Sequence, residues 1–308
     1  MMDFFRRFRH AVSMPDQSPG SPLRLALLIS LLTSACVAYS AEADATPSAT
    51  TDKAPLTKQV PRTVIRDQKK LAELTVTELS ANLVDRVIHD LPVERHIQLI
   101  SQLDADELDE ALDTQQKQLT FWINIYNGFT QYFLKKDPSL YQQDRGKFFG
   151  KKQIEVAGYT VSMEDIEHGV LRRGATVLSA GYIRALWLRS RFIKQFAVDE
   201  VDYRIHFALN CGALSCPPVV AYQEDLIDRQ LDDNSRYYLQ REVVVEDEGK
   251  LARIPALMLW FSADFGSSDD KVQLLIRHGA LAPGLNPQLD YLPYDWTIAI
   301  ENYRSYQY

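Results

Sequence analysis

The chain has 308 residues, of which 46% are hydrophobic, 24% charged and 10% aromatic, and its formal net charge is -7. This composition is ordinary for a globular protein, and the length allows one large domain or two small ones. Binding to a phosphate backbone needs clustered Lys and Arg, which an acidic chain with only short basic runs lacks. We therefore expect no nucleic-acid partner, and instead a small molecule or another protein.

The N-terminal residues have the pattern of an export signal. An apolar run over residues 25–41 is shorter than the roughly 20 residues that a membrane span needs. The basic residues before it are Arg6, Arg7, Arg9 and Arg24. Ala41-Glu42-Ala43 has the spacing that a signal peptidase accepts. We expect residues 1–43 to be cleaved, which leaves a periplasmic or secreted chain without an integral membrane span.

Two alternatives stay open at this end of the chain. The signal could remain uncleaved as an anchor, or Cys36 could carry a lipid, although Thr33 stands three places before it, where leucine is expected. If Cys36 leaves with the signal, the mature chain keeps only Cys211 and Cys216. An even pair of cysteines in an oxidising compartment favours a disulfide between them.

After the signal, the composition predicts a tether and then one domain. Residues 44–61 are rich in Ala, Thr, Asp and Pro and cannot bury enough apolar surface to offset their ordering entropy. We expect this segment to be disordered. We expect residues 62–308 to form a single globular domain.

The first part of this domain is expected to be helical. Apolar residues recur at helical spacing over residues 71–113, where His89 and His96 are expected at the surface or in caps. Residues 118–134 are apolar on most faces, which predicts a buried central helix. Asn124 and Asn127 point to one side of it, either to tie neighbouring loops or to line a site.

A hairpin and a further helix are expected next. Residues 151–161 alternate around Gly158, and Ser162 begins a helix with acidic residues in its first turn. This helix places His168 and Arg172 one turn apart, where Arg172 is expected to hold an acidic group.

The stretch of residues 202–218 is expected to carry any chemistry. Residues 203–209 alternate with the period of a β-strand, which places His206 and Asn210 on one face. The following loop, CGALSCPP, has small residues that can present backbone N–H groups.

The remaining elements complete the expected fold class. The pattern predicts helices over 223–239, 256–265 and 270–278, a strand pair at 243–245 and 250–252, and an edge segment at 291–298. The sequence therefore predicts an α+β fold: one helix-rich domain with a small, mostly antiparallel sheet.

Four motifs in order carry a family resemblance: FWINIYN, DIEHGVLR, HFALNCGALSCPP and YDWTI. Together they resemble the bacterial exported branch of domain-of-unknown-function family 547, over about residues 103–298. The resemblance implies a shared pocket around Asn124, Asn127, His168 and His206, without a stated reaction. Plant members carry Ser or Asp at the position of Cys216, which implies that this cysteine is not a family-wide nucleophile.

Several chemistries are open at this pocket. A cysteine hydrolase or transferase would pair Cys216 with His206, oriented by Asn124, although Pro217 and Pro218 supply no N–H groups to an oxyanion. A zinc site would use His168, His206, Cys211 and Cys216. Ser215 does not lie in a G-x-S-x-G motif, which surrounds the nucleophile of many serine hydrolases. A histidine alone could act as a general base.

The alternative to these chemistries is an exported binding module whose His and Asn side chains hold a polar ligand, and we favour this function. No metal and no cofactor are expected. The candidate catalytic residues are His206, Cys216, His168 and Asn124. The candidate ligand-binding residues are Asn127, Arg172 and Asn210, and the candidate disulfide joins Cys211 and Cys216.

Overall fold

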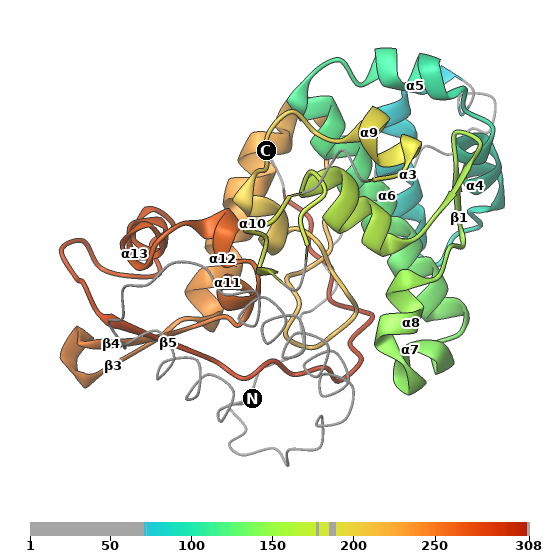
Figure 1. The fold of residues 1–308 in the computed structure, drawn as a ribbon. Coiled ribbons are helices and arrows are strands. Elements are labelled where there is room, and N and C mark those ends of the chain that lie inside the picture. The colour runs from blue at the N-terminus through green and yellow to red at the C-terminus, as the bar shows by residue number, and fades with distance from the viewer. Residues whose placement is uncertain (1–70, 72, 177–178, 185–188, 307–308) are drawn as a thin grey trace, which may run out of the picture. The chain divides into compact units, whose positions relative to one another are not determined.

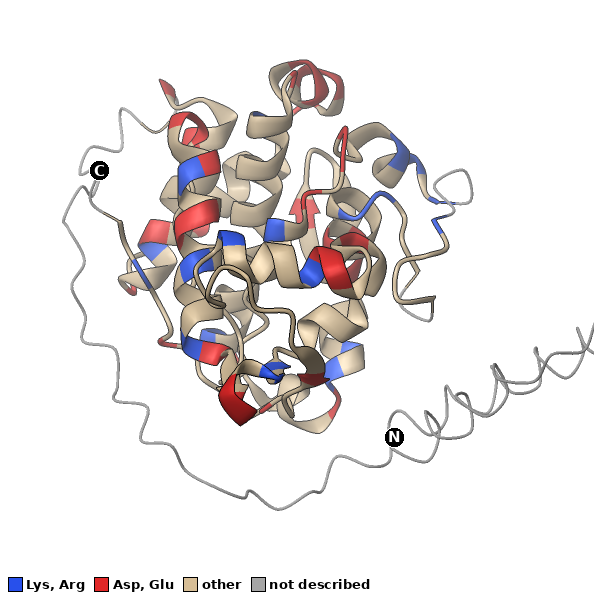
Figure 2. Cartoon of the chain, turned by 90° about the vertical axis from the view of Figure 1, so that its left-hand side faces the viewer, with Lys and Arg blue, Asp and Glu red and all other residues tan. Residues whose placement is uncertain are grey.

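The computed structural model describes residues 71, 73–176, 179–184 and 189–306 (Figure 1). The expected signal peptide, tether and lipid-anchor Cys36 lie outside the described residues. The described part is a helix-rich α+β fold, as predicted from the sequence. Within it, no helix combines the length and hydropathy needed to cross a membrane. Residues of both charge signs are interspersed over the elements in Figure 2.

The first helical stretch forms three helices. They are α3 (Val76–Ile88), α4 (Glu94–Ser101) and α5 (Ala105–Ala111). The α3 helix begins with a capping box between Thr75 and Glu78, and His89 caps its C-terminus as expected. The prediction for His96 was wrong, because its ring is buried and its Nε2 lies 2.6 Å from Oδ1 of Asn82.

The predicted central helix is α6 (Gln115–Lys136), and it is buried along most of its length. It packs beside α3, as Figure 1 shows. A Cβ at Gly128 would lie 3.0 Å from Cδ2 of Leu83, so this glycine allows the two helices to approach closely. The helix thus forms the centre of the larger hydrophobic cluster.

A series of short elements follows α6. They are α7 (Ser139–Gln143), α8 (Arg145–Gly150), β1 (Ile154–Val156), β2 (Tyr159–Val161), the π-helix η2 (Asp165–Leu171) and α9 (Arg191–Phe196). The strands form the predicted antiparallel hairpin. Gly169 of η2 packs against α9, because a Cβ there would lie 2.6 Å from Cδ1 of Ile193.

The predicted strand over residues 203–209 was wrong. Residues Tyr203–Phe207 form the 3-10 helix η5, with the Asp202 side chain accepting a hydrogen bond from the Arg204 N–H. Three consecutive side chains of η5, those of Ile205, His206 and Phe207, are all buried. In a half-buried strand, residues alternate because one face is buried and the other is exposed. The alternation of residues 203–209 does not have this cause.

The last part of the chain contains most of the strands. Its elements are η6 (Glu224–Leu226), α10 (Ile227–Glu242), β3 (Val244–Glu246), η7 (Asp247–Gly249), β4 (Leu251–Ile254), α11 (Leu257–Trp260), α12 (Ser262–Phe265), α13 (Ser268–Arg277) and β5 (Gln288–Tyr291). Strand β4 pairs antiparallel with β3 and parallel with β5. The described sheets are thus two small ones, with antiparallel pairing in two of the three strand pairs.

Two large hydrophobic clusters divide the core, and η5 joins them. Ile205 belongs to the cluster around α6, whereas Phe207 belongs to the cluster around α10, α11 and α13. His206 stands between these two residues in the sequence. The fold therefore places a buried histidine at the junction of the two clusters.

Candidate functional site

A buried ionic network surrounds Asp264 of α12. We define the Asp264 cluster as Asp264, His206, Arg172, Arg184 and His168. Oδ2 of Asp264 accepts hydrogen bonds from Arg172 Nε at 2.6 Å and lies 2.9 Å from His206 Nε2. Its Oδ1 accepts one from Arg184 Nη2 at 2.6 Å. The network joins side chains from η2, η5, α12 and the segment 179–184.

The π-helix η2 explains how His168 and Arg172 meet. The Arg172 N–H donates to the Glu167 carbonyl at 2.9 Å, a bond that spans five residues instead of four. Nη1 of Arg172 then lies 3.1 Å from Nδ1 of His168. The predicted neighbourhood of these two side chains is confirmed, although the helix type was not foreseen.

Asp264 is the central residue that sequence analysis missed. It lies in the sequence LMLWFSADFG, where it is the one charged side chain in an apolar helical stretch. A carboxylate in such a position is buried only when it is paired. That isolation was the available signal, but the sequence did not reveal which cations would pair with it.

Burial and pairing set the charges of this cluster. Burial is the largest influence on the pKa of His206 and His168, and it lowers both below the usual value. Burial acts to raise the pKa of Asp264, but the bonds from His206 and Arg172 hold it below its usual value. Near neutral pH the cluster therefore contains two neutral histidines, one carboxylate and two guanidinium groups, and the Glu167 carboxyl group lies beside it, with Oε1 3.7 Å from Nδ1 of His168.

The Arg172 guanidinium is fully buried yet incompletely paired. Its side chain has 0% exposure, its plane lies over Phe261 at 4.5 Å, and Nη2 has no hydrogen-bond partner within the part of the chain that the structure describes. A Cβ at Gly181 would lie 2.5 Å from Nη2, so a side chain at this position would press on the guanidinium. Phe261 also stacks on His206, with ring centroids 4.1 Å apart. The cluster thus has a donor without an acceptor.

Further basic groups lie near His168. Burial lowers the pKa of His168, Glu167 opposes this shift, and Arg172, His206 and Arg189 add to it. The buried Nε of Arg189 also has no hydrogen-bond partner among the described residues. Its Nη2 donates to the carbonyls of Gly174 and Ala175. His168 is the more accessible histidine, with 18% of its side chain exposed. The two N–H groups for which the described residues provide no acceptor, those of Arg172 Nη2 and Arg189 Nε, therefore both lie near His168.

The three candidate asparagines are buried and bind backbone groups. Asn124 accepts from the Tyr222 N–H at 3.0 Å and donates to the Tyr222 carbonyl at 2.9 Å. Asn127 donates to the Ala208 carbonyl and accepts from the Asn210 N–H, each at 2.9 Å. Asn210 in turn donates to the Pro217 carbonyl at 2.7 Å. Of the two roles open for the α6 amides, these contacts match the tying of loops.

The two cysteines lie together in the loop after η5. Both are free thiols, and Tyr294 Oη lies 3.3 Å from Sγ of Cys211 and 3.1 Å from Sγ of Cys216. The backbone N–H of Cys211 donates to Sγ of Cys216 at 3.1 Å. Tyr294 belongs to the segment 291–298, which runs along this loop and binds it through the hydrogen bond from Leu214 N to Thr297 O at 2.7 Å.

The environments of the two thiols differ. Burial acts to raise the pKa of Cys216, but hydrogen bonds from Cys211 and Tyr294 hold it below its usual value. The hydrogen bond to Cys216, followed by burial, raises the pKa of Cys211 well above its usual value. Cys216 is therefore the sulfur that is better stabilised as a thiolate.

The structure does not bring His168, His206, Cys211 and Cys216 together as a zinc site. In the described part of the chain, no group of three or more His, Cys, Asp or Glu side chains is placed to hold a metal ion. His206 contacts Asp264, whereas Cys216 contacts Tyr294 and Cys211. The proposed pairing of Cys216 with His206 also finds no direct hydrogen bond among these contacts. Ser215 accepts a hydrogen bond from the Asp295 N–H.

Comparison with known proteins identifies one segment of the chain. Residues 110–239 match the family model "Protein of unknown function, DUF547". The match supports the family resemblance over this segment, and its description states no activity. The DUF547 segment contains Arg172, His168 and His206, whereas their partner Asp264 lies C-terminal to it. Searches of curated proteins and of solved structures gave no match.

Proposed function

We propose that the mature chain is an exported binding module that holds an acidic group at the Asp264 cluster. The observation that carries the proposal is Nη2 of Arg172, a buried cationic donor for which the described residues supply no acceptor. Leaving such a group unsatisfied costs about 1–3 kcal/mol, and more when it is charged. An oxygen of a bound carboxylate or phosphate would remove this cost.

The charge balance supports an anionic ligand. Around the two neutral histidines, the three arginines Arg172, Arg184 and Arg189 outnumber the two carboxyl groups of Asp264 and Glu167. Guanidinium groups are suited to planar carboxylates and phosphates because their N–H donors have a fixed fork geometry. Arg189 adds a second unpartnered N–H near His168.

The contacts favour binding over catalysis. His206 Nε2 is engaged by Asp264 and its ring is stacked on Phe261. Both α6 amides are engaged by backbone groups. A general base must reach the proton that it removes, and these groups are committed to holding the fold. The ligand would therefore be held by Arg172 and His168, with His206 and Asp264 orienting Arg172.

Calorimetric titration of the mature protein with citrate and with inorganic phosphate tests this proposal. Arg172→Met should weaken binding of the preferred anion at least about tenfold, since a buried charge contact is removed. Arg173→Met is the matched control, because Arg173 is bonded to the carbonyls of Val198 and Asp199 and should leave binding within twofold. Circular dichroism should show that both variants are folded.

If Arg172→Met does not fold, His168→Gln serves as the second variant, because this side chain is partly exposed. It should also weaken binding, while Arg191→Met, at an exposed position of α9, should not. Absence of anion binding to the native chain would overturn the proposal. Binding that is unchanged in both Arg172→Met and His168→Gln would overturn it as well.

A second candidate function is thiol chemistry at Cys216. It is favoured by the hydrogen bonds that Cys211 N–H and Tyr294 direct to this sulfur and by its lowered pKa. In the reduced protein, iodoacetamide should then modify Cys216 faster than a free cysteine peptide at pH 7, and Tyr294→Phe should slow the reaction. Equal rates in the two proteins would exclude an activated thiol.

Export and the redox state of the thiols have their own tests. The basic leader and apolar run of residues 1–43 support export, so the mass of the mature protein should correspond to cleavage after Ala43. In an oxidising compartment the pair Cys211 and Cys216 should form a disulfide. Alkylation before and after reduction should then label two thiols only after reduction, whereas labelling without reductant would exclude the disulfide.

A further inference from the structure

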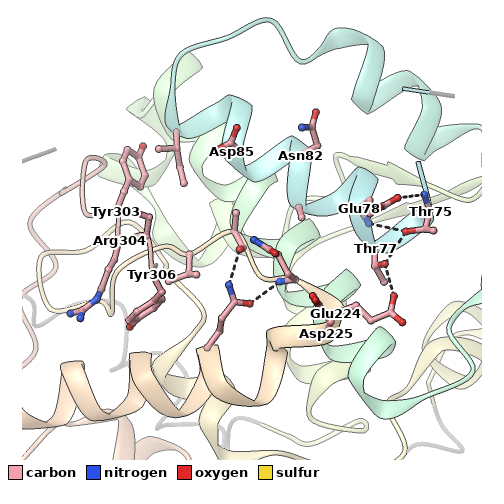
Figure 3. A pocket seen from close by; sticks show the side chains of 17 residues that line it. Thr75, Thr77, Glu78, Asn82, Asp85, Glu224, Asp225, Tyr303, Arg304 and Tyr306 are labelled. Carbon is pink, nitrogen blue, oxygen red and sulfur yellow. Dashed lines mark hydrogen bonds between the residues drawn. The ribbon is translucent and has the colours of Figure 1, made fainter. Parts of the chain in front are cut away.

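A cavity of about 610 Å³ lies apart from the Asp264 cluster, against one face of α3. Its other walls are the chain around η6 and residues 303–306 near the C-terminus (Figure 3). Small-molecule sites typically have volumes of about 300–1,000 Å³. The cavity therefore has the size of a ligand site, and nothing in the proposed function uses it.

The charge of this cavity is opposite to that of the Asp264 cluster. Its lining includes four carboxylates, those of Glu78, Asp85, Glu224 and Asp225. The one arginine in the lining is Arg304, whose guanidinium lies over the rings of Tyr237 at 3.6 Å and Tyr306 at 4.6 Å. The carboxylates outnumber the cations, so the cavity favours a positively charged ligand.

One carboxylate oxygen of Asp85, a residue of the cavity lining, lacks a hydrogen-bond partner among the described residues. Its Oδ1 lies 3.5 Å from Nδ1 of His89, whereas its Oδ2 is buried and finds no hydrogen-bond partner in the described ranges of the chain. Burial is the largest influence on this carboxyl and raises its pKa. The side chain is 24% exposed, and a cation bound beside this carboxyl group would favour its ionised form.

Asn82 supplies a complementary donor one turn before Asp85 on α3. It is only 7% exposed, and its Oδ1 is engaged by Nε2 of the buried His96 at 2.6 Å. This contact leaves the amide N–H groups for the cavity, where Asn82 forms part of the wall. Among the described residues, its Nδ2 has no hydrogen-bond partner. A buried amide held in this orientation can donate to a polar atom of the ligand.

We infer that this cavity binds a small organic ammonium compound. The cationic nitrogen pairs with Asp85, the Asn82 amide donates to a polar atom of the ligand, and Ala81, Val220 and Tyr303 contact its apolar part. A bare metal ion fits the site less well, because the described residues contain no cluster of three ligating side chains. The site is independent of the anion site proposed at Arg172.

Calorimetric titration of the mature protein with spermidine tests this inference. Asp85→Asn removes the charge without changing the shape and should weaken binding about tenfold or more. Ala81→Leu fills the cavity without altering its charge and should weaken binding to a similar extent. Glu107→Gln, at an exposed acidic position of α5 outside the lining, is the matched control and should leave the dissociation constant within twofold.

Three outcomes would overturn the inference. They are absence of spermidine binding, equal weakening by Glu107→Gln and Asp85→Asn, and displacement of spermidine by an equal concentration of magnesium chloride. The second and third would indicate attraction to the acidic surface as a whole. Arg172→Met should leave spermidine binding unchanged, which separates this site from the anion site.

Discussion

The Asp264 cluster and the α3 cavity each contain a shielded carboxylate, but the two groups have opposite pKa shifts. Asp264 accepts from Arg172, Arg184 and His206, and its pKa is lowered. Asp85 has an oxygen that no described residue pairs with, and its pKa is raised. Burial acts in the same direction on both, so partners decide the outcome. The missing partner is an anion at Arg172 and a cation at Asp85.

The largest effect should come from breaking the cluster at its centre. Asp264→Asn leaves Arg172 buried without its counter-ion, which should lower the free energy of unfolding by about 3–5 kcal/mol. Urea denaturation at pH 7 measures this loss. Asp290→Asn, at an exposed position of β5, is the control and should change it by less than about 0.5 kcal/mol.

The lowered pKa of Asp264 also predicts how the stability of the protein depends on pH. Because the folded pKa of Asp264 is lowered, its contribution to stability is present above the unfolded pKa of about 3.9 and is lost as pH falls through the folded value. Asp264→Asn should lack this part of the acid destabilisation. A loss below about 1 kcal/mol at pH 7 would contradict the assignment of Asp264 as the centre of the network.

The next largest effect on stability tests whether the amide side chains of α6 stabilise the fold or bind a ligand. Asn127→Ala leaves the Ala208 carbonyl and the Asn210 N–H without partners, which should lower the unfolding free energy by about 2–3 kcal/mol. Gln142→Ala, at an exposed position of α7, should change it little. Weaker citrate or phosphate binding with unchanged stability would instead place Asn127 in the ligand site.

His96 contacts Asn82, which lines the cavity. Protonation of this histidine should change the free energy of unfolding by a smaller, pH-dependent amount. Burial, followed by the charge of Arg86, lowers its pKa to about 4. As pH falls from about 6.5 towards this value, the unfolded chain takes up the proton first and the unfolding free energy decreases. The slope for one proton is at most about 1.4 kcal/mol per pH unit.

Urea denaturation of the native protein and His96→Gln at pH 7, 6 and 5 measures this contribution. The two stability curves should converge as pH falls, because the variant has lost one of the buried histidines that must be protonated. Parallel curves would show that His96 is not held neutral by burial.

The smallest effect should come from the cavity carboxylate. At pH 7 the fold disfavours the ionised form of Asp85, because its pKa is raised by burial. Asp85→Asn should therefore leave the unfolding free energy equal or up to about 1 kcal/mol higher, and the gain should fade as pH falls and Asp85 becomes protonated. Destabilisation by more than about 1 kcal/mol would show that the fold already provides a partner for Asp85, which would remove the contrast with Asp264.

Local patterns in the sequence predicted much of the fold. The buried α6 helix, the β1–β2 hairpin, α10 and the β3–β4 pair were all expected from periodicity and turn residues. The closeness of His168 and Arg172 also followed from their spacing. These features depend on neighbours within a few residues, and the physical signal for them is therefore local.

Tertiary structure decided the rest. Residues 203–207 form a 3-10 helix whose last three side chains are buried where the two hydrophobic clusters meet, and this packing overrides their strand-like alternation. Asp264 meets Arg172 across 92 residues, and Tyr294 meets Cys211 across 83 residues. Residue spacing carries no information about contacts over such separations. The sequence by itself determined most of the helical segments and which polar residues are available, and only the packing of those segments decided the conformation of residues 203–207, which charges are paired and which await a ligand.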